Sequence, residues 1–479
     1  MLAGDEGREE AHVKDLTLGI DIGTSSLKAV VARPDGTVVA RRKLANRIGF
    51  PTSERMEHDA RRAWWLAPRR VMTDLSRLGV AEPTAICVAG LVPSLAAVDG
   101  RGRPVSAGLL YGDTRGTVPA ELSTMPVGRA PELLRHLVAA EPSASAYWPV
   151  QAVANRSLGG PGAIDVTTAI AMSPLFDGSS WDVRYCAEAG CLPENLPEVA
   201  GIAEPIGKVG SAVLASGIVD TLAEQIVAGA VEIGDVLVIC GTTLVIWVVT
   251  DEWKEVPGLW TVPHTVAGRT LIGGASNAGG MFLDWATKFT GSAPGQTNPA
   301  SIPVWAPYPR GERTPLHDTA LRASLIGLEL SHDRPQVRRA AFEAAGFVVR
   351  QHIDLAGIPA RRVVATGGGT SRAEWLQALA DCTRLPVDVA AVPECGALGA
   401  AYVARMSAGL ESGFDAATAW ARVGRRIEPA ESWVDHADDR YQMFQRLVSG
   451  QQPVAGHPAG AGEPAVPPVA RSGTGFSDN

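Results

Sequence analysis

The sequence predicts an α/β protein made of two related halves. Residues 16–32, LTLGIDIGTSSLKAVVA, read as an apolar strand, a Gly-Thr-Ser-Ser turn and a second apolar strand. Residues 235–250, DVLVICGTTLVIWVVT, repeat this design around a Gly-Thr-Thr turn. One β-hairpin with such a turn is common, but a copy in each half of the chain indicates a duplicated architecture with two facing turns.

Length and composition are typical of a folded protein with more than one core. The chain has 479 residues, enough for two domains. A hydrophobic content of 46% and a charged content of 20% indicate a packed protein rather than a disordered one. The net charge of −8 argues against nucleic acid or an anionic membrane as the main partner.

The same composition predicts a cytoplasmic protein without a membrane span. The polar, acidic N-terminal residues contain no apolar segment of the signal-peptide kind. The longest apolar run, near residues 236–249, is interrupted by Gly-Thr-Thr and is too short to cross a bilayer. Six scattered cysteines without a CxxC motif are expected to be reduced and structural.

Hydrophobic periodicity and turn residues predict the order of the elements. In the first half we expect three antiparallel strands over 16–42, a helix over 59–78, strands at 84–90 and 107–111, and helices near 130–140 and 144–156. In the second half we expect a helix from Asp220, a Gly-rich turn at Gly273-Gly274, a strand at 362–366, and helices over 279–289, 334–357, 371–382 and 394–408. Residues 117–210 are expected to form a variable insertion that carries specificity, and 211–233 a hinge between the halves.

The two Gly-Thr turns are suited to binding phosphate groups. Glycine lets the backbone approach a ligand closely, and the turns offer N–H groups and hydroxyls to an anion. The predicted phosphate-binding residues are Gly23, Thr24, Ser25, Gly241, Thr242 and Thr243. Asp21 ends the first strand, where burial of a carboxylate is costly without a cation or donors, so it is a candidate for the magnesium site. The alternative is an ordinary strand-end Asp, and Lys28 reads as a solvated strand residue.

Three glycines, Gly367, Gly368 and Gly369, separate a buried strand from a helix. Glycines there let a ligand lie against the backbone, and the helix N-terminus favours nearby negative charge. The motif is not GxGxxG and lacks a ribose-binding acid at the usual spacing, so a dinucleotide-binding fold is not expected. The alternative is a plain strand–helix turn.

These segments, in this order, resemble the FGGY carbohydrate kinases, which have the actin-like ATPase (ribonuclease H-like) fold. The resemblance runs from residue 16 to 406. The segments that carry it are GIDIGTSSLKAVV, LLYGDTR at 109–115, GIVDTLAEQIVAG at 217–229, GTT at 241–243, RGERTP at 310–315, ATGGGTSRAEWLQALAD at 365–381 and GALGAA at 396–401. Within the family, the GERTP and GGG–helix segments look most like those of xylulokinases.

The resemblance implies two actin-like domains, each with a twisted mixed sheet, and ATP, Mg²⁺ and a sugar in the cleft between them. In that case the adenosine of ATP is expected to lie against the backbone of Gly367, Gly368 and Gly369. We expect domains at 15–225, on the sugar side, and 226–448, on the nucleotide side, with flexible tails at 1–14 and 449–479. Asp220 matches the general base of the family, for which the alternative is a helix N-cap. Family members are often dimers, so a homodimer is one expected assembly.

The resemblance also bears on the acceptor. Asp113, Arg115 and Asp220 match residues that line the sugar site of the family. Asp113 and Arg115 belong to a loop with the family pattern W-x-D-x-R. The aromatic residue of that loop is shifted or replaced here, with Tyr111 preceding Asp113. The segment 90–94, GLVPS, lacks the Gln-Met-His that touches the sugar in xylulokinases, and an apolar loop cannot make the same hydrogen bonds. A ketopentose such as xylulose is the leading acceptor, with ribulose, glycerol or a tetritol as alternatives. A non-catalytic sugar or nucleotide sensor is a further alternative, disfavoured because Asp21, Asp220 and both turns are retained.

Overall fold

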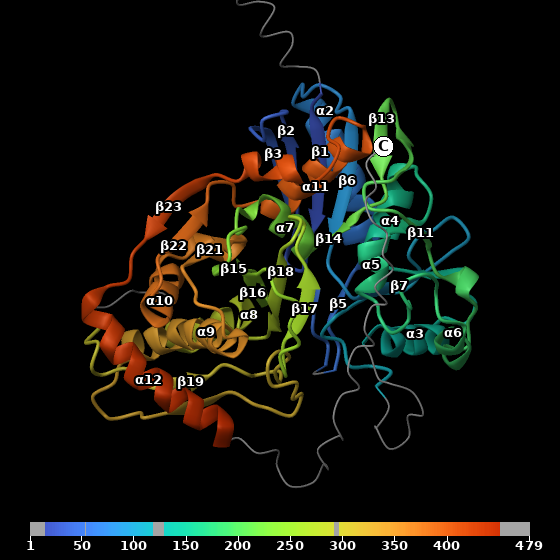
Figure 1. Cartoon of the computed structure of the whole chain (residues 1–479). Helices are drawn as coiled ribbons and strands as arrows, with labels where there is room; N and C mark the ends of the chain where they lie inside the picture. The colour runs from blue at the N-terminus through green and yellow to red at the C-terminus, as the bar shows by residue number, and fades with distance from the viewer. Residues whose placement is uncertain (1–14, 53, 118–128, 292–296, 451–479) are drawn as a thin grey trace, which may run out of the picture.

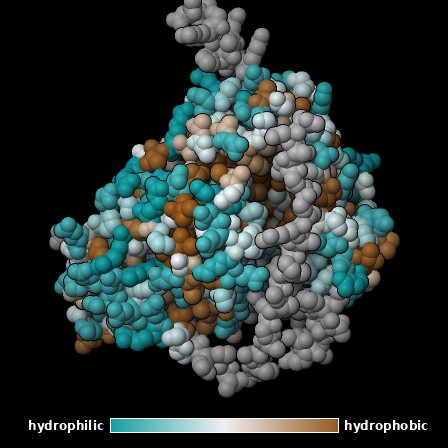
Figure 2. Space-filling model, viewed as in Figure 1, coloured by the Kyte–Doolittle hydropathy of each residue, from teal (hydrophilic) through white to brown (hydrophobic). Residues whose placement is uncertain are grey.

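The computed structural model describes residues 15–52, 54–117, 129–291 and 297–450. The first and second halves of the chain form two sheet-containing bodies, which lie side by side in Figure 1. Hydrophilic residues cover most of the outer surface in Figure 2, and hydrophobic residues gather in the recess between the halves. Among the described helices, none is both long and apolar enough to cross a membrane.

The sheet of the first half has the order β12-β13-β6-β1-β2-β3, and β14 also pairs with β6. The strands β1, β2 and β3 run antiparallel in a meander, whereas β6 is parallel to β1 and to β13. Their bounds are β1 Thr17–Ile22, β2 Ser26–Ala32, β3 Val38–Ala45, β6 Ala85–Gly90, β12 Pro205–Val209, β13 Ala212–Ala215 and β14 Ile218–Val219. All of β1 and β6 is buried, as their continuous apolar sequences predict.

The sheet of the second half repeats this topology, with the order β17-β18-β16-β15-β21-β22-β23. Here β15, β16 and β18 form the antiparallel meander, and β21 is parallel to β15 and to β22. Their bounds are β15 Asp235–Cys240, β16 Leu244–Thr250, β17 Trp260–Pro263, β18 Thr270–Ser276, β21 Arg362–Thr366, β22 Val387–Ala390 and β23 Val423–Ile427. The prediction of two duplicated α/β halves is therefore confirmed.

Helices cover the sheets, and both halves contain additional short strands. The helices are α2 Ala67–Arg77, α3 Arg129–Ala140, α4 Val150–Leu158, α5 Val166–Ile170, α6 Val183–Ala189, α7 Asp220–Ala228, α8 Gly280–Thr290, α9 Arg334–Ala356, α10 Ala373–Thr383, α11 Cys395–Ser407 and α12 Glu431–Gly450, with a π-helical turn Arg61–Leu66 leading into α2. The short strands are β4 Ile48–Gly49, β5 Glu57–His58, β7 Ser94–Val98, β8 Gly108–Leu110, β9 Ala146–Trp148, β10 Ala163–Asp165, β11 Glu198–Ala200, β19 Val304–Ala306 and β20 Ser324–Ile326.

The helix α11 belongs to the second half by sequence but packs against β1, β2 and β6 of the first sheet and against α7 (Figure 1). Its small residues allow this close approach. A Cβ added at Gly19 would lie 1.8 Å from the carbonyl oxygen of Ala397, and one at Gly399 would lie 1.8 Å from that of Ala223. The stripe of glycine and alanine in α11 thus sets the positions of β1 and α7, which carry Asp21 and Asp220.

Three sequence-based expectations differ from the structure. The helix expected over 144–156 is a strand, β9, followed by α4, because Pro149 precedes the first helical residue. Gly273 and Gly274 lie inside β18, where a Cβ on Gly273 would be 2.0 Å from the carbonyl oxygen of Ile246. The hinge expected from 211 starts as β13 and β14 of the first sheet. The tails at 1–14 and 451–479 lie outside the described residues, and 449–450 end α12.

Candidate active site

The first Gly-Thr turn, residues 23–25, connects β1 to β2 and is held through its carbonyl groups. The carbonyl oxygen of Gly23 accepts a hydrogen bond from Asn46 Nδ2 at 2.9 Å, and that of Thr24 lies 2.7 Å from His58 Nε2. The backbone N–H of Asn46 donates to the carbonyl of Ser25 at 2.9 Å. Each of the three carbonyls is therefore bonded to a group outside the turn.

The second turn, residues 241–243, connects β15 to β16 and is held by the start of α8. The backbone N–H of Gly280 donates to the carbonyl of Gly241, and that of Met281 donates to the carbonyl of Thr242, both at 2.9 Å. Glycine is required at position 279, just before α8, because a Cβ there would lie 2.3 Å from the carbonyl carbon of Thr243. The turn and the helix N-terminus therefore form one backbone unit.

Asp21, at the end of β1, is buried and paired with Lys28. Lys28 Nζ lies 3.2 Å from Asp21 Oδ2, and the lysine side chain is 17% exposed. The charges of Asp21 and then Glu224 raise the pKa of Lys28, against the effect of burial. The expectation of a solvated Lys28 is therefore wrong, because strand pairing sets Lys28 directly opposite Asp21.

Asp220 is the first residue of α7 and lies close to two other acids. Its Oδ1 accepts a hydrogen bond from the backbone N–H of Thr221 at 2.7 Å. Burial, followed by the charges of Asp21 and Glu224, raises the pKa of Asp220 to about 8. One turn further along α7, Glu224 accepts a hydrogen bond from Thr366 Oγ1 at 2.6 Å and so joins the helix to the end of β21.

Tyr111 lies where the two halves meet. Its hydroxyl is 3.3 Å from Thr24 Oγ1, and the guanidinium of Arg313 lies 5.3 Å from the centre of its ring. Burial raises the pKa of Tyr111, while the charge of Arg313 and side-chain hydrogen bonding to Thr24 and Thr243 act against that rise. Next to it, the carbonyl of Gly112 accepts a hydrogen bond from Arg310 at 3.2 Å. The first Gly-Thr turn, the second turn and the loop at 310–313 thus all lie close to Tyr111 and Gly112.

The side chains of Asp113 and Arg115 form an ion pair within the first half. Arg115 donates to both carboxylate oxygens of Asp113, at 2.9 and 2.7 Å, and to Glu57 at 2.7 Å. The backbone N–H of Met56 donates to Asp113 Oδ2 at 3.0 Å. Asp113 is fully buried, so its carboxylate fixes the loop that begins at Tyr111.

The three glycines after β21 have different surroundings. Gly367 has a φ of 85°, in the region that favours glycine, and a Cβ at Gly369 would lie 2.2 Å from the ring of Trp375. A Cβ at Gly368 would meet no heavy atom within 4 Å. Gly367 and Gly369 are thus required by the fold itself, whereas the backbone at Gly368 borders open space.

A magnesium ion fits the first turn. Oδ1 of Asp21 is buried and has no hydrogen-bond partner among the described residues, so one oxygen is available for a cation or its water. The described residues contain no cluster of three or more His, Cys, Asp or Glu side chains that could hold a metal. One carboxylate with water and phosphate oxygens is a common way for Mg²⁺ to bind, so Asp21 would hold it together with the nucleotide.

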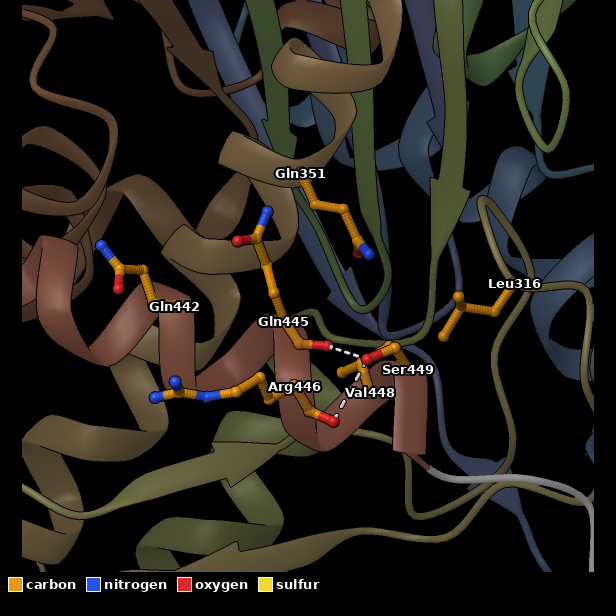
Figure 3. Close-up of a pocket in the computed structure, with 7 residues that line it drawn as sticks. All are labelled: Leu316, Gln351, Gln442, Gln445, Arg446, Val448 and Ser449. Atoms are coloured by element: carbon orange, nitrogen blue, oxygen red, sulfur yellow. Dashed lines mark hydrogen bonds between the residues drawn. The ribbon is translucent and has the colours of Figure 1, made fainter.

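A separate hollow of about 480 Å³ lies between α9, α12 and the loop at Leu316 (Figure 3). Gln351 and Gln445 line it, and Ser449 donates to backbone carbonyls of its own helix, α12. It contains none of the predicted site residues.

Sequence reasoning left out several residues of this site. Those with a clear contact are Lys28, His58, Glu224 and Arg313. The sequence could have indicated Lys28, because residues on the two sides of a tight hairpin turn pair with each other, as Asp21 and Lys28 do here. The position of Glu224, four residues after Asp220, places both on one face of α7. No local pattern links His58 or Arg313 to the turns.

Comparisons with known proteins show the family of the chain. The profile of the N-terminal domain of the FGGY family of carbohydrate kinases matches residues 16–123, and that of the C-terminal domain matches 236–408. The chain belongs to the FGGY family of carbohydrate kinases. This FGGY kinase is accordingly a sugar-phosphorylating enzyme with the actin-like ATPase fold, as the resemblance implied.

Individual relatives of this FGGY kinase differ in their acceptors. It is 24% identical to a xylulose kinase from Klebsiella pneumoniae, over 91% of this chain and 99% of the relative. It is 23% identical to a gluconokinase from Bacillus subtilis, over 83% of this chain and 89% of the relative. The crystal structure of a xylulose kinase from Rhodospirillum rubrum matches with a TM-score of 0.72 and 26% identity, covering 91% of this chain and 98% of that one.

Proposed function

We propose that this FGGY kinase transfers the γ-phosphoryl group of ATP to a hydroxyl of a ketopentose such as xylulose, with Asp220 as the general base. The observation that carries the proposal is the position of Asp220 at the head of α7, next to Asp21, with a pKa raised to about 8. A base with a pKa near the working pH combines a useful ionised fraction with a strong tendency to accept a proton.

In the proposed reaction, Asp220 accepts the proton of the acceptor hydroxyl as that oxygen attacks the γ-phosphorus. The turns at 23–25 and 241–243 hold the phosphates of ATP through N–H groups and hydroxyls, and the backbone at Gly368 borders the adenosine. Asp21, whose buried Oδ1 has no hydrogen-bond partner among the described residues, would hold Mg²⁺, and the bound ion would supply positive charge beside the phosphates. The charge of Lys28 lies opposite Asp21 and lowers the pKa of Asp220, so it favours the ionised base.

The acceptor is proposed to bind on the side of Tyr111, bordered by the loop that Asp113 and Arg115 stabilise. The segment 91–94 offers few polar groups to it. Leu91 is buried, and the hydroxyl of Ser94 is used inside the protein, donating to the carbonyl of Leu91 at 3.0 Å and accepting from the N–H of Val150 at 3.2 Å. This feature supports a second candidate, a sugar acid or polyol whose hydroxyls are bound elsewhere.

The test is ADP release from MgATP with a panel of pentuloses, polyols and aldonates, followed by the variant Asp220→Asn. We expect one pentulose to give the highest kcat/KM, and Asp220→Asn to lower kcat by about 10³-fold or more while binding of ATP persists. Turnover near the wild-type rate in Asp220→Asn would contradict the assignment of the base. A preference for an aldonate or polyol would replace xylulose with the second candidate. A cytoplasmic location and a homodimer stay predictions.

A further inference from the structure

The orientation of the first turn follows from the bonds to its carbonyl groups. In a planar trans peptide, the C=O of one residue and the N–H of the next point in opposite directions. Because the carbonyls of Gly23 and Thr24 are bonded to Asn46 and His58, the N–H groups of Thr24 and Ser25 point away from these anchors. Across the described residues, neither N–H has a hydrogen-bond acceptor in the structure. These two N–H groups are the donors that the turn can offer to a phosphate.

The side chain of His58 has a single consistent proton arrangement. The indole N–H of Trp64 lies 3.0 Å from His58 Nδ1. An indole nitrogen can only donate, so Nδ1 must accept and the proton of the neutral ring lies on Nε2. Nε2–H then donates to the carbonyl of Thr24. Burial lowers the pKa of His58 and so maintains this neutral form.

The packing around His58 prevents the ring from turning away. His58 is 1% exposed and Trp64 is fully buried. The backbone approaches the indole so closely that a Cβ at Gly108 would lie 2.3 Å from it. The short strand β5, which carries His58, pairs with β8 at Gly108. The chain Trp64, His58, Thr24 therefore links the buried core of the first half to the phosphate turn.

We propose that His58 is a positioning residue for nucleotide binding: by fixing the carbonyl of Thr24, it directs the N–H of Ser25 toward the phosphates of ATP. This inference rests on the proposed role of the first turn as a phosphate site. It assigns His58 no contact with the ligand. Loss of the bond therefore weakens the nucleotide site selectively, whereas the acceptor site keeps its own contacts.

The test compares His58→Leu, which removes the donor, with His58→Gln, whose amide can donate to the carbonyl of Thr24. We expect His58→Leu to raise KM for ATP and the Kd of MgADP, measured by calorimetry, about tenfold or more, with KM for the acceptor within about twofold. We expect His58→Gln to retain both values within about threefold of the wild type.

Two further variants separate positioning from general stability. Trp64→Phe removes the donor to Nδ1 and leaves the histidine in place, so it should raise the Kd of MgADP about threefold. Trp181→Phe is the matched control, because the indole N–H of Trp181 donates to the carbonyl of Pro197 at 2.8 Å in another part of the first half. We expect Trp181→Phe to lower the melting temperature without changing the Kd of MgADP.

The proposal is overturned if folded His58→Leu binds MgADP as the wild type does, or if Trp181→Phe weakens binding as much as Trp64→Phe. If His58→Leu does not fold, Trp64→Phe and His58→Gln decide by the same criterion. Failure of the proposed function looks different: the wild type would then bind MgADP without phosphorylating any acceptor of the panel. The calorimetric comparison applies in that case too, since it needs no turnover.

Discussion

The two Gly-Thr turns occupy the same place in two copies of one topology, yet they are held by different means. Side chains of Asn46 and His58, together with one backbone N–H, bind the carbonyls of the first turn. The second turn is bound by backbone N–H groups of Gly280 and Met281 at the start of α8. The first turn can therefore be altered by changing single side chains, whereas the second depends on glycines that let the helix approach.

The copies also differ in charge. Asp21 stands two residues before Gly23 in β1, while Ile239 stands two residues before Gly241 in β15. The buried ion pair between Asp21 and Lys28 thus has an apolar counterpart in the second half. Of the two copies, the first alone carries at this position a carboxylate, the one proposed to hold Mg²⁺.

The largest effect should follow from adding a methyl group at Gly279, which precedes α8 and packs against the second turn. In Gly279→Ala the new Cβ would meet backbone atoms of residues 243 and 244, at distances from 2.3 Å. We expect a loss of about 3 kcal/mol of unfolding free energy. Denaturant unfolding measures this, with Gly368→Ala as the control, because a Cβ there meets nothing within 4 Å. Equal stability of the two variants would contradict the conclusion that close backbone contacts with the start of α8 hold the second turn.

Lys28→Met should have the next largest effect, because it leaves the carboxylate of Asp21 buried without its partner. Removal of one member of a buried ion pair typically costs about 3 kcal/mol, and we expect somewhat less because Lys28 is 17% exposed. The double variant Asp21→Asn with Lys28→Met should recover part of this loss. A double-mutant cycle of unfolding free energies measures the coupling, and additive losses would show that the pair does not interact.

The three neighbouring acids Asp21, Asp220 and Glu224 predict a pH dependence of stability in the protein without nucleotide. The pKa of Asp220 is 3.8 when unperturbed and is raised to about 8 in the folded protein. The neutral carboxyl favours folding, so its contribution is complete below about pH 4 and is lost as pH rises toward 8. Asp220→Asn should therefore gain stability over the wild type as pH rises, by about 1–2 kcal/mol at pH 8 after allowance for the partial exposure of Asp220.

Thermal unfolding from pH 4 to pH 9 measures this difference between Asp220→Asn and the wild type. The gain in stability of Asp220→Asn over the wild type should be absent at pH 4 and should level off above pH 8. A constant difference across the range would mean that Asp220 does not titrate as the structure indicates. Buffers without Mg²⁺ are needed, because a bound cation would favour the ionised carboxylate.

The smallest effect should come from Tyr111→Phe, which removes the hydroxyl that contacts Thr24 and lies near Thr243. We expect a loss of about 1 kcal/mol of unfolding free energy. Tyr147→Phe is the matched control, since its hydroxyl donates to the carbonyl of Glu141 at 3.0 Å away from the turns. Only Tyr111→Phe should also change KM for ATP; an unchanged KM would show that the link between the turns has no role in binding.

Local sequence patterns were sufficient to predict much of the fold. The continuous apolar runs of β1, β15 and β21 identify buried strands, and the Gly-Thr turns between paired runs identify the hairpins. The prediction of a helix beginning at Asp220 is confirmed by α7. Prediction from local patterns failed where the signals were ambiguous. Gly273 and Gly274 look like a turn but lie in β18, where the neighbouring strand leaves no room for a side chain on Gly273.

By itself the sequence determined the duplicated α/β architecture and the candidate Asp21, because strand and turn signals act over a few neighbouring residues. The order of its motifs determined the family, and that resemblance made Asp220 the candidate base. Only the tertiary structure decided how these residues are supported. It packs α11 of the second half on β1, binds Arg115 to the carboxylate of Glu57, and brings His58 to the carbonyl of Thr24 across 34 residues of chain. Such contacts depend on how distant segments pack against each other, and the identity of the residues in either segment does not specify that packing.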